Sequence, residues 1–220
     1  MGNRIPNVLV IAAAVAAACA VSCKSGAAEE AVGFTAEELR LIGDSDSLMR
    51  VLSVTDDADE EILRRKSSEL ESAALLSDDY RILAEKMLAT VVAPEHDGVG
   101  IAAPQVGISR RMVAVQRFDM EGEPFIVYPN IRIDSLYGER KPGGEGCLSV
   151  PGKRGEVLRW SDIIISYTDT GKLRAGDEFG SCTVRDTVSG FTAVIFQHEA
   201  DHLDGILYTD RAETVTDYRL

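Results

Sequence analysis

Residues 197–202 read Gln-His-Glu-Ala-Asp-His and contain two of the three histidines of the 220-residue chain. In a helix, His198 and His202 lie on one face, one turn apart. That spacing lets a nitrogen of each imidazole reach one metal ion at about 2.0–2.1 Å. Glu199, about 100° further round the helix, would flank the ion as a general base. The alternative is a helix with two ordinary hydrogen-bonded histidines.

A catalytic ion needs a third protein ligand and an open position for water. Cys147, in the glycine-rich segment 143–152, offers a thiolate in an unhindered loop, and thiolates are suitable soft ligands. The alternative for this residue is a buried structural cysteine. A downstream ligand would have to be Asp204, Asp210 or Glu213, because no third histidine follows His202.

A third segment, 98–107, reads Gly-Val-Gly-Ile-Ala-Ala-Pro-Gln-Val-Gly. The side-chain amide of Gln105 is a suitable donor to an oxyanion, and Gly98 and Gly100 would let backbone approach a substrate closely. The alternative is a tight turn into a strand. A phosphate-binding loop is disfavoured, because no Lys-Ser/Thr pair follows the glycines.

Taken in order, "GVGIAAPQ", "EGCLS" and "QHEADH" resemble the three signature motifs of the peptide deformylase family. The resemblance covers residues 49–211. It implies an α+β fold, with mixed antiparallel sheets around a central C-terminal helix that carries His-Glu-x-x-His. It also implies a metal-dependent amidase that releases formate from N-formylmethionyl peptides, in the N-terminal processing step of protein biosynthesis.

The same resemblance makes Cys147, His198 and His202 the ligands of one divalent metal ion. It implies Fe²⁺ as the native ion, with Zn²⁺, Ni²⁺ or Co²⁺ able to occupy the site. The Cys/His/His set itself suits several of these ions, so the sequence does not select among them.

Catalytic roles follow from the resemblance as well. Glu199 would carry the proton from water to the leaving amine, while the Gln105 amide and the backbone N–H of Leu148 would hold the oxyanion. Arg154 matches a family arginine near the mouth of the cleft, and a solvated surface arginine is the alternative. The residues implied in substrate binding are Val99, Gly100, Gly146, Phe191 and Val194.

Several elements must position these residues. The central helix is predicted over about 190–203, where Phe191, Val194 and Ile195 share the histidine face and should point into the core. Two further helices are predicted over 34–42, with a capping box of Thr35 and Glu38, and over 77–92. Strands are predicted over 112–117, 125–133, 162–169 and 181–188, with an edge strand over 49–54.

The N-terminal region resembles a bacterial lipoprotein leader: Arg4, an apolar run over 8–21, and a lipobox-like sequence ending at Cys23. We expect a signal peptide over 1–23, a tether with a short helix over 24–48, the catalytic domain over 49–212 and a tail over 213–220. Lipidation of Cys23 would anchor the protein in the cell envelope. The alternatives are an uncleaved apolar tail, or a cytoplasmic protein whose translation starts near Met49.

The formal net charge of −13 disfavours nucleic acid as a partner, because an acidic surface repels phosphate. We expect a monomer that binds N-formylmethionyl peptides. Two other functional classes stay open at this point. One is a zinc endopeptidase with a downstream third ligand, and the other is a non-catalytic formyl-peptide-binding lipoprotein.

Overall fold

The structure is a computed structural model, and it describes residues 32–218. The helices, with two short 3₁₀ segments labelled η, are α1 (Ala36–Ile42), α2 (Asp57–Leu63), α3 (Ser72–Leu75), α4 (Asp78–Val91), η1 (Ala103–Val106), α5 (Thr170–Arg174), η2 (Phe179–Cys182), α6 (Gly190–Leu203) and α7 (Tyr208–Arg211). The strands are β1 (Gly100–Ala102), β2 (Met112–Gln116), β3 (Phe125–Pro129), β4 (Arg132–Cys147), β5 (Val150–Thr168), β6 (Thr183–Ser189) and β7 (Thr214–Asp217).

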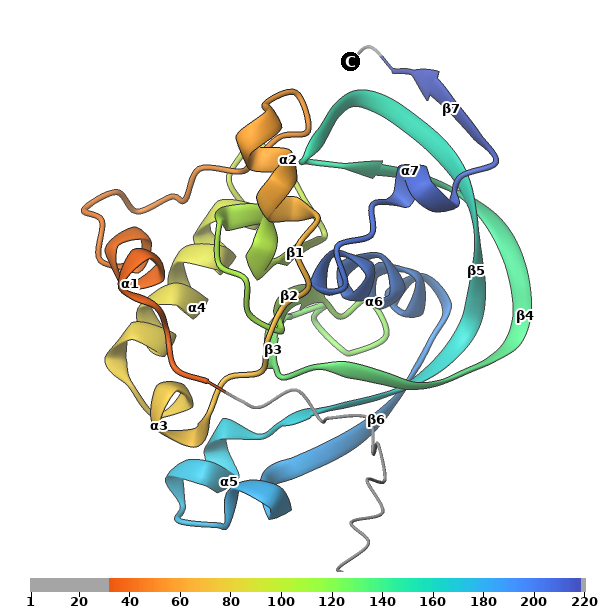
Figure 1. Cartoon of the computed structure of the whole chain (residues 1–220). Helices are drawn as coiled ribbons and strands as arrows, with labels where there is room; N and C mark the ends of the chain where they lie inside the picture. Colours follow the sequence, from red (N-terminus) through yellow and green to blue (C-terminus); the bar gives the residue numbers. More distant parts are fainter. Residues whose placement is uncertain (1–31, 219–220) are drawn as a thin grey trace, which may run out of the picture.

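Two antiparallel sheets make up the β part of the fold. One has the order β1-β2-β3, and the other has the order β4-β5-β6, with β7 pairing on β5. The long β4–β5 hairpin curves around α6, which lies at the centre of the molecule (Figure 1). This arrangement is the α+β fold that the resemblance implied, with the His-Glu-x-x-His helix in the middle.

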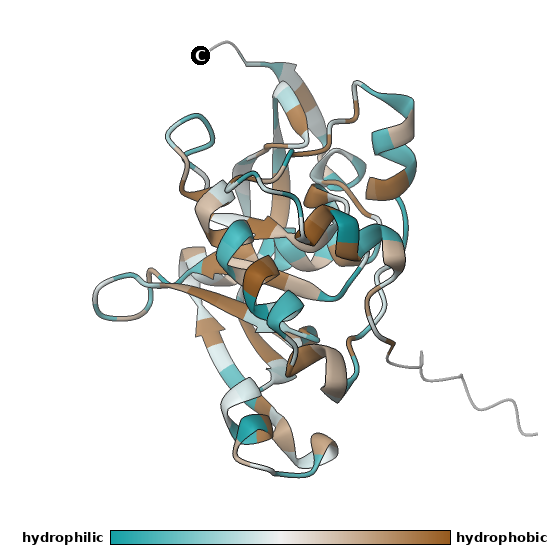
Figure 2. Cartoon of the chain, turned by 90° about the vertical axis from the view of Figure 1, so that its left-hand side faces the viewer, coloured by the Kyte–Doolittle hydropathy of each residue, from teal (hydrophilic) through white to brown (hydrophobic). Residues whose placement is uncertain are grey.

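Apolar side chains fill the space between the sheets and the helices. One cluster joins α4 to the first sheet, through buried Leu83 and Met87, and another joins α6 to β5, through Phe196, Ile163 and Ile165. Hydrophobic residues are frequent along the strands, whereas the helices carry both hydrophilic and hydrophobic residues (Figure 2). Burial of α6 on both sides fixes the position of its polar residues.

The predicted helices are confirmed at their ends as well as in their type. The Thr35 hydroxyl accepts from the Glu38 N–H, and the Glu38 carboxylate accepts from the Thr35 N–H, which completes the predicted capping box of α1. The Ser77 side chain caps α4 by accepting from the Tyr80 N–H. Side-chain oxygens at these positions satisfy N–H groups that the first turn leaves without partners.

Helix α1 packs into the folded body, although the sequence placed it in a segment that leads up to the domain. Ile42 is fully buried in the core. Glu38 accepts from Arg110 Nε at 3.0 Å and from Nη2 at 2.7 Å, and the two side chains are only 7% and 4% exposed. Removal of either partner would leave the other charge buried and unpaired.

The predicted edge strand over residues 49–54 is wrong. This segment forms no regular secondary structure and pairs with neither sheet. Instead, the Leu52 N–H donates to the Gln105 carbonyl at 2.8 Å, and the Val54 N–H donates to the Ser149 carbonyl at 2.9 Å. It therefore ties together the two segments that the sequence singled out around Gln105 and Cys147.

The β4–β5 hairpin also extends well beyond the predicted strands. The predicted strand over 125–133 is two strands, β3 and β4, because Asn130 adopts a left-handed conformation (φ 54°) and turns the chain. The predicted tail over 213–220 contains β7, which pairs with residues 153–156 of β5. Helices α2 and α3 were not predicted, since each is shorter than the window in which helical periodicity is visible.

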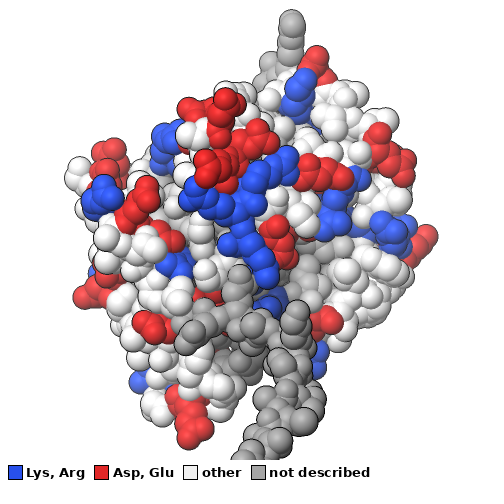
Figure 3. Space-filling model, in the orientation of Figure 1, with Lys and Arg blue, Asp and Glu red and all other residues white. Residues whose placement is uncertain are grey.

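Acidic and basic side chains are both present on the face shown in Figure 3, with Lys and Arg gathered near its middle and Asp and Glu around them.

Within residues 32–218, no helix is long and apolar enough to cross a membrane. The predicted signal peptide and Cys23 lie outside the described residues.

Candidate metal centre

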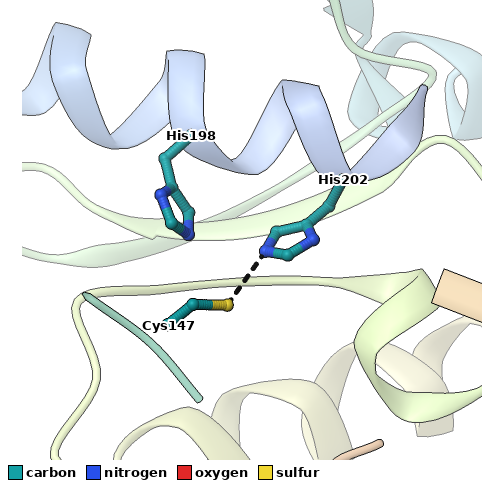
Figure 4. A group of neighbouring side chains, drawn as sticks. All are labelled: Cys147, His198 and His202. Carbon is teal, nitrogen blue, oxygen red and sulfur yellow. Dashed lines mark hydrogen bonds between the residues drawn. The ribbon is translucent and has the colours of Figure 1, made fainter. Parts of the chain in front are cut away.

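Three side chains that are far apart in the sequence converge between the end of β4 and helix α6. Cys147 is the last residue of β4, and His198 and His202 point toward it from α6 (Figure 4). One ligand atom of each lies within 4.8 Å of the others, and Cys147 Sγ is 3.2 Å from His202 Nε2. A thiolate and two imidazoles at these separations could hold one metal ion.

Besides the apolar cluster, one buried amide links α6 to β5. Gln197 is 5% exposed, and its Oε1 accepts from the Trp160 N–H at 3.0 Å, while its Nε2 donates to the Trp160 carbonyl at 2.8 Å. These two bonds tie α6 to β5 at the residue directly before His198.

The charge state of Cys147 suits a ligand. Burial raises the pKa of its thiol, but the imidazoles of His202 and His198 outweigh burial and hold the pKa well below its ordinary value. A lowered pKa favours the thiolate, the form that binds metals. Cys147 and Cys182 are both free, so the structure contains no disulfide between them.

Glu199 lies beside the three ligand candidates and is only 4% exposed. Its Oε2 is buried without a hydrogen-bond partner among the described residues. Burial raises its pKa to about 7. A buried carboxylate oxygen without a protein partner fits a site in which water or substrate supplies the hydrogen bond. Together with the three ligand atoms, Glu199 therefore fits a metal ion that carries a water molecule.

Gln105 approaches the same point from η1. Its Oε1 accepts from the Ala102 N–H at 2.8 Å, and its Nε2 donates to Ser149 Oγ at 3.2 Å and to Cys147 Sγ at 3.4 Å. The accepted bond fixes which end of the amide is which, so the N–H₂ group faces the thiolate. A donor is thus held beside the candidate metal centre.

Sequence reasoning missed Glu145, whose carboxylate contacts the Nδ1 atom of His198. Glu145 Oε2 lies 2.8 Å from His198 Nδ1, and Arg159 donates to both Glu145 oxygens, at 2.8 and 3.1 Å. Burial raises the pKa of Glu145, but His198 and Arg159 outweigh it and lower the pKa to about 2. The sequence carried only a weak signal for this role, the position of Glu145 two residues before Cys147, because a register shift lies between them in β4.

The ion pair between Glu145 and Arg159 is extended toward the surface by two further residues, Asp201 and Arg211. Arg159 Nη1 donates to Asp201 at 2.7 Å, and Arg211 donates to both Asp201 oxygens at 2.6 Å. Arg159, Asp201 and Arg211 also line a cavity of about 920 Å³, together with Gln197 and Ala200 of α6. This cavity borders none of the three metal-ligand candidates, so the chain of ion pairs separates it from the metal centre.

The residues predicted to bind substrate lie on both sides of the centre. Gly100, on β1, is packed against Glu199, and Val99 and Val194 are half-buried. The prediction that Phe191 points into the core is wrong: it is 57% exposed, at the first turn of α6, and its ring lies 5.3 Å from that of Phe118. Leu148 and Gly146 flank Cys147 in the chain, with Leu148 half-buried and Gly146 exposed.

A thiolate and two histidines beside a buried glutamate, on an α+β scaffold, define a metal-dependent hydrolase. Residues 51–217 match the family described as Polypeptide deformylase. The chain therefore belongs to the peptide deformylase family, enzymes that remove N-terminal formyl groups. The family implies a divalent metal ion, and the Cys/His/His group is compatible with one.

Relatives support this membership over most of the chain. A peptide deformylase of Desulforudis audaxviator is 40% identical over 155 residues, covering 70% of this chain and 89% of the relative. One from Finegoldia magna is 37% identical over 150 residues, covering 68% and 83%.

Solved structures agree in fold. A class I type b peptide deformylase from Acinetobacter baumannii, with Met-Ala-Ser bound, is 35% identical, covers 74% of this chain and 98% of its own, and superposes with a TM-score of 0.62. The peptide deformylase of Thermotoga maritima is 30% identical, with coverage of 76% and 99% and a TM-score of 0.61.

Proposed function

We propose that this chain hydrolyses the formyl group of N-formylmethionyl peptides, with Cys147, His198 and His202 holding one divalent ion that is natively Fe²⁺. The observation that carries the proposal is the convergence of these three ligand atoms, within 4.8 Å, beside the partnerless buried oxygen of Glu199. When bound, such an ion supplies Lewis-acid chemistry, activating water at neutral pH and polarising a carbonyl oxygen.

Glu199 is the proton carrier in this proposal. It accepts a proton from the attacking water and delivers it to the amine that leaves when formate is released. Its burial keeps bulk water away from the carboxylate, and its free Oε2 is the oxygen available for this transfer. Gly100 gives the carboxylate its space, because the backbone at that position carries no side chain.

Gln105 and Leu148 stabilise the oxyanion that forms on the formyl carbon. The Gln105 N–H₂ group is oriented by its accepted bond from Ala102 and directed at Cys147 Sγ. The backbone N–H of Leu148 follows directly after Cys147 and is the second donor in the proposal. Donors fixed before the reaction cost no reorganisation as the charge develops.

The substrate peptide binds as an added strand. Among the described residues, β1 pairs only with β2 and β4 pairs only with β5, so each strand has an unpaired edge. Gly100 and Gly146 lie on these edges and leave room for a peptide backbone. The methionine side chain lies against Val99, Val194 and Phe191. Met-Ala-Ser bound to the relative from A. baumannii supports a peptide of this kind.

The endopeptidase alternative needs a ligand downstream of His202, yet among the described residues the group close enough to hold one ion is Cys147, His198 and His202, without Asp204, Asp210 or Glu213. Asp204 pairs with Arg111 at 2.8 Å, and Asp210 pairs with Arg64. Cys147, in contrast, is directed at His202. A purely binding protein would need neither Glu199 nor the Gln105 amide at the centre.

Formate release from formyl-Met-Ala-Ser by anaerobically purified protein, with metal analysis of the same sample, tests the proposed function. We expect one ion per chain and sustained turnover. Glu199→Gln should lose turnover and keep the ion. Turnover that persists in Glu199→Gln would rule out Glu199 as the proton carrier, and metal-loaded wild-type protein without formate release would rule out the function.

We also propose that the protein is a lipid-anchored enzyme of the cell envelope, on the strength of the leader that ends at Cys23. A cytoplasmic form starting at Met49 would lack α1, and Arg110 would lose its ion pair with Glu38. Fractionation of the native protein tests this: recovery in the membrane fraction with acylated Cys23 is expected, and an unlipidated protein in the cytosol would contradict it.

A further inference from the structure

The C-terminal strand β7 holds one arginine of the β4–β5 hairpin in place. Strand β7 pairs with β5 so that Arg154 faces Thr216 and Lys153 faces Asp217. Lys153 Nζ binds Asp217 at 2.5 Å, and the chain then brings Tyr218 over Arg154, with the guanidinium carbon 5.7 Å from the ring centroid. The cation–π contact and the strand pairing together restrict where this guanidinium can lie.

The guanidinium of Arg154 is also held from the other side. Its Nη2 donates to the Gly144 carbonyl at 3.4 Å, and a Cβ on Gly144 would lie 2.9 Å from its Nε. Arg154 forms no ion pair among the described residues. Of the nearby acids, Asp217 is paired with Lys153, and Glu156 is exposed. An oriented guanidinium without a carboxylate partner therefore lies against Gly144 of β4.

The distance from Cys147 to Gly144 matches the length of a tripeptide. Strand β4 ends at Cys147 in the turn that leads to β5, so a peptide pairing with its free edge can extend from the metal centre only toward Gly144. Three residues of strand span roughly 10 Å. An extended peptide with its formyl carbon at Cys147 would therefore have its third residue alongside Gly144 and Arg154.

We infer that Arg154, clamped by Tyr218, binds the free α-carboxylate of formyl tripeptides, so that this enzyme prefers short released formyl-peptides over the ends of long chains. The inference rests on the proposed function, because it places formyl-peptides along β4. A guanidinium is suited to this task, because its planar donors match the two oxygens of a carboxylate.

The test compares formyl-Met-Ala-Ser with its C-terminal amide, using the metal-loaded full chain. In the wild type we expect kcat/KM to be about tenfold higher for the free acid, mainly through KM, since a remote contact binds ground and transition states alike. Arg154→Gln should reduce the acid-to-amide ratio to about 1. Tyr218→Ala should reduce it in part, and raised salt should reduce it in the wild type, because the contact is exposed to solvent.

Arg140→Gln is the matched control. Arg140 lies on the same hairpin, stacks on Trp160 at 5.8 Å and, like Arg154, has no ion pair among the described residues. The ratio should be unchanged in this variant. Equal kcat/KM for acid and amide in an active wild type, or a ratio that survives Arg154→Gln, would overturn the inference and leave the proposed function standing. Absence of formate release from both peptides would instead overturn the proposed function.

Discussion

Glu199 and Gly100 pack so closely that a Cβ on Gly100 would lie 2.5 Å from Glu199 Oε1 and 2.9 Å from Ile195. No left-handed φ is involved at Gly100, so glycine is required here for space. The β1 backbone is thus part of the wall that positions the carboxylate. Any side chain at residue 100 must push Glu199 away from the metal centre.

We therefore predict that Gly100→Ala lowers kcat by roughly 100-fold, because a shift of about 1 Å at a reacting group has an effect of that order. The variant should retain its metal ion, since Gly100 touches none of the ligands. Steady-state formate release and metal analysis check this. Gly180→Ala is the control, since an added Cβ there meets nothing within 4 Å; equal kcat in the two variants would contradict the packing argument.

A second prediction concerns the Glu145 carboxylate, which contacts His198 Nδ1. Glu145→Gln weakens both the contact with His198 Nδ1 and the ion pair with Arg159, so the imidazole is less firmly oriented. Metal affinity should fall by about 10–100-fold, the usual effect of losing such a partner. Competition with a chelator measures the affinity. Glu139→Gln, on an exposed part of the same hairpin, should not change it; a shared loss in both variants would point to a general effect on the hairpin.

A third prediction concerns α1. A chain that starts at Met49 should be less stable than one that starts at Val32 by about 2–5 kcal/mol, because the core loses the fully buried Ile42 side chain. Arg110 also loses its ion pair with Glu38. Urea unfolding of the two truncated chains gives the difference. Equal free energies of unfolding would show that α1 is dispensable to the fold.

A fourth prediction concerns pH. Asp59 accepts from Arg50 and from the Ser53 N–H, and the bond from Arg50, despite burial, lowers its pKa below the ordinary value. Its stabilising contribution is therefore full above the ordinary aspartate pKa, about 3.9, and is lost as pH falls through the lowered value. Asp59→Asn should destabilise the protein by about 1–3 kcal/mol at pH 7.

The difference between wild type and Asp59→Asn should disappear in acid, below the folded-state pKa. Urea unfolding at a series of pH values measures it. Because Asp59 holds the segment that bonds to Gln105 and Ser149, the same substitution should also lower kcat at neutral pH. A destabilisation that is constant across the pH series would contradict the assigned role of the ionised carboxylate.

The sequence predicted the parts of the site that depend on local geometry. The spacing of His198 and His202 on one helix face, and the caps of α1 and α4, follow from residues within one or two turns of each other. The pairing of Cys147 with these histidines came first from ligand chemistry and then from the family resemblance. The structure brings all three together.

The rest depended on contacts between distant parts of the chain. Glycines at 143, 144 and 146 hide the alternating pattern of β4, so the long hairpin was not visible in the sequence. The partners Arg159, Asp201 and Arg211 come from three elements, and only the folded hairpin aligns them with Glu145. The sequence does not predict strand β7, since four residues carry too weak a pattern to identify a strand.

The most direct test of the central claim is the metal content and activity of Cys147→Ala beside the wild type, both purified without oxygen. We predict one ion per chain and formate release for the wild type, and loss of both for the variant, with the fold retained by circular dichroism. A Cys147→Ala protein that keeps its ion and still releases formate would contradict the account, because the thiolate would then be no ligand and the metal would have to be bound elsewhere.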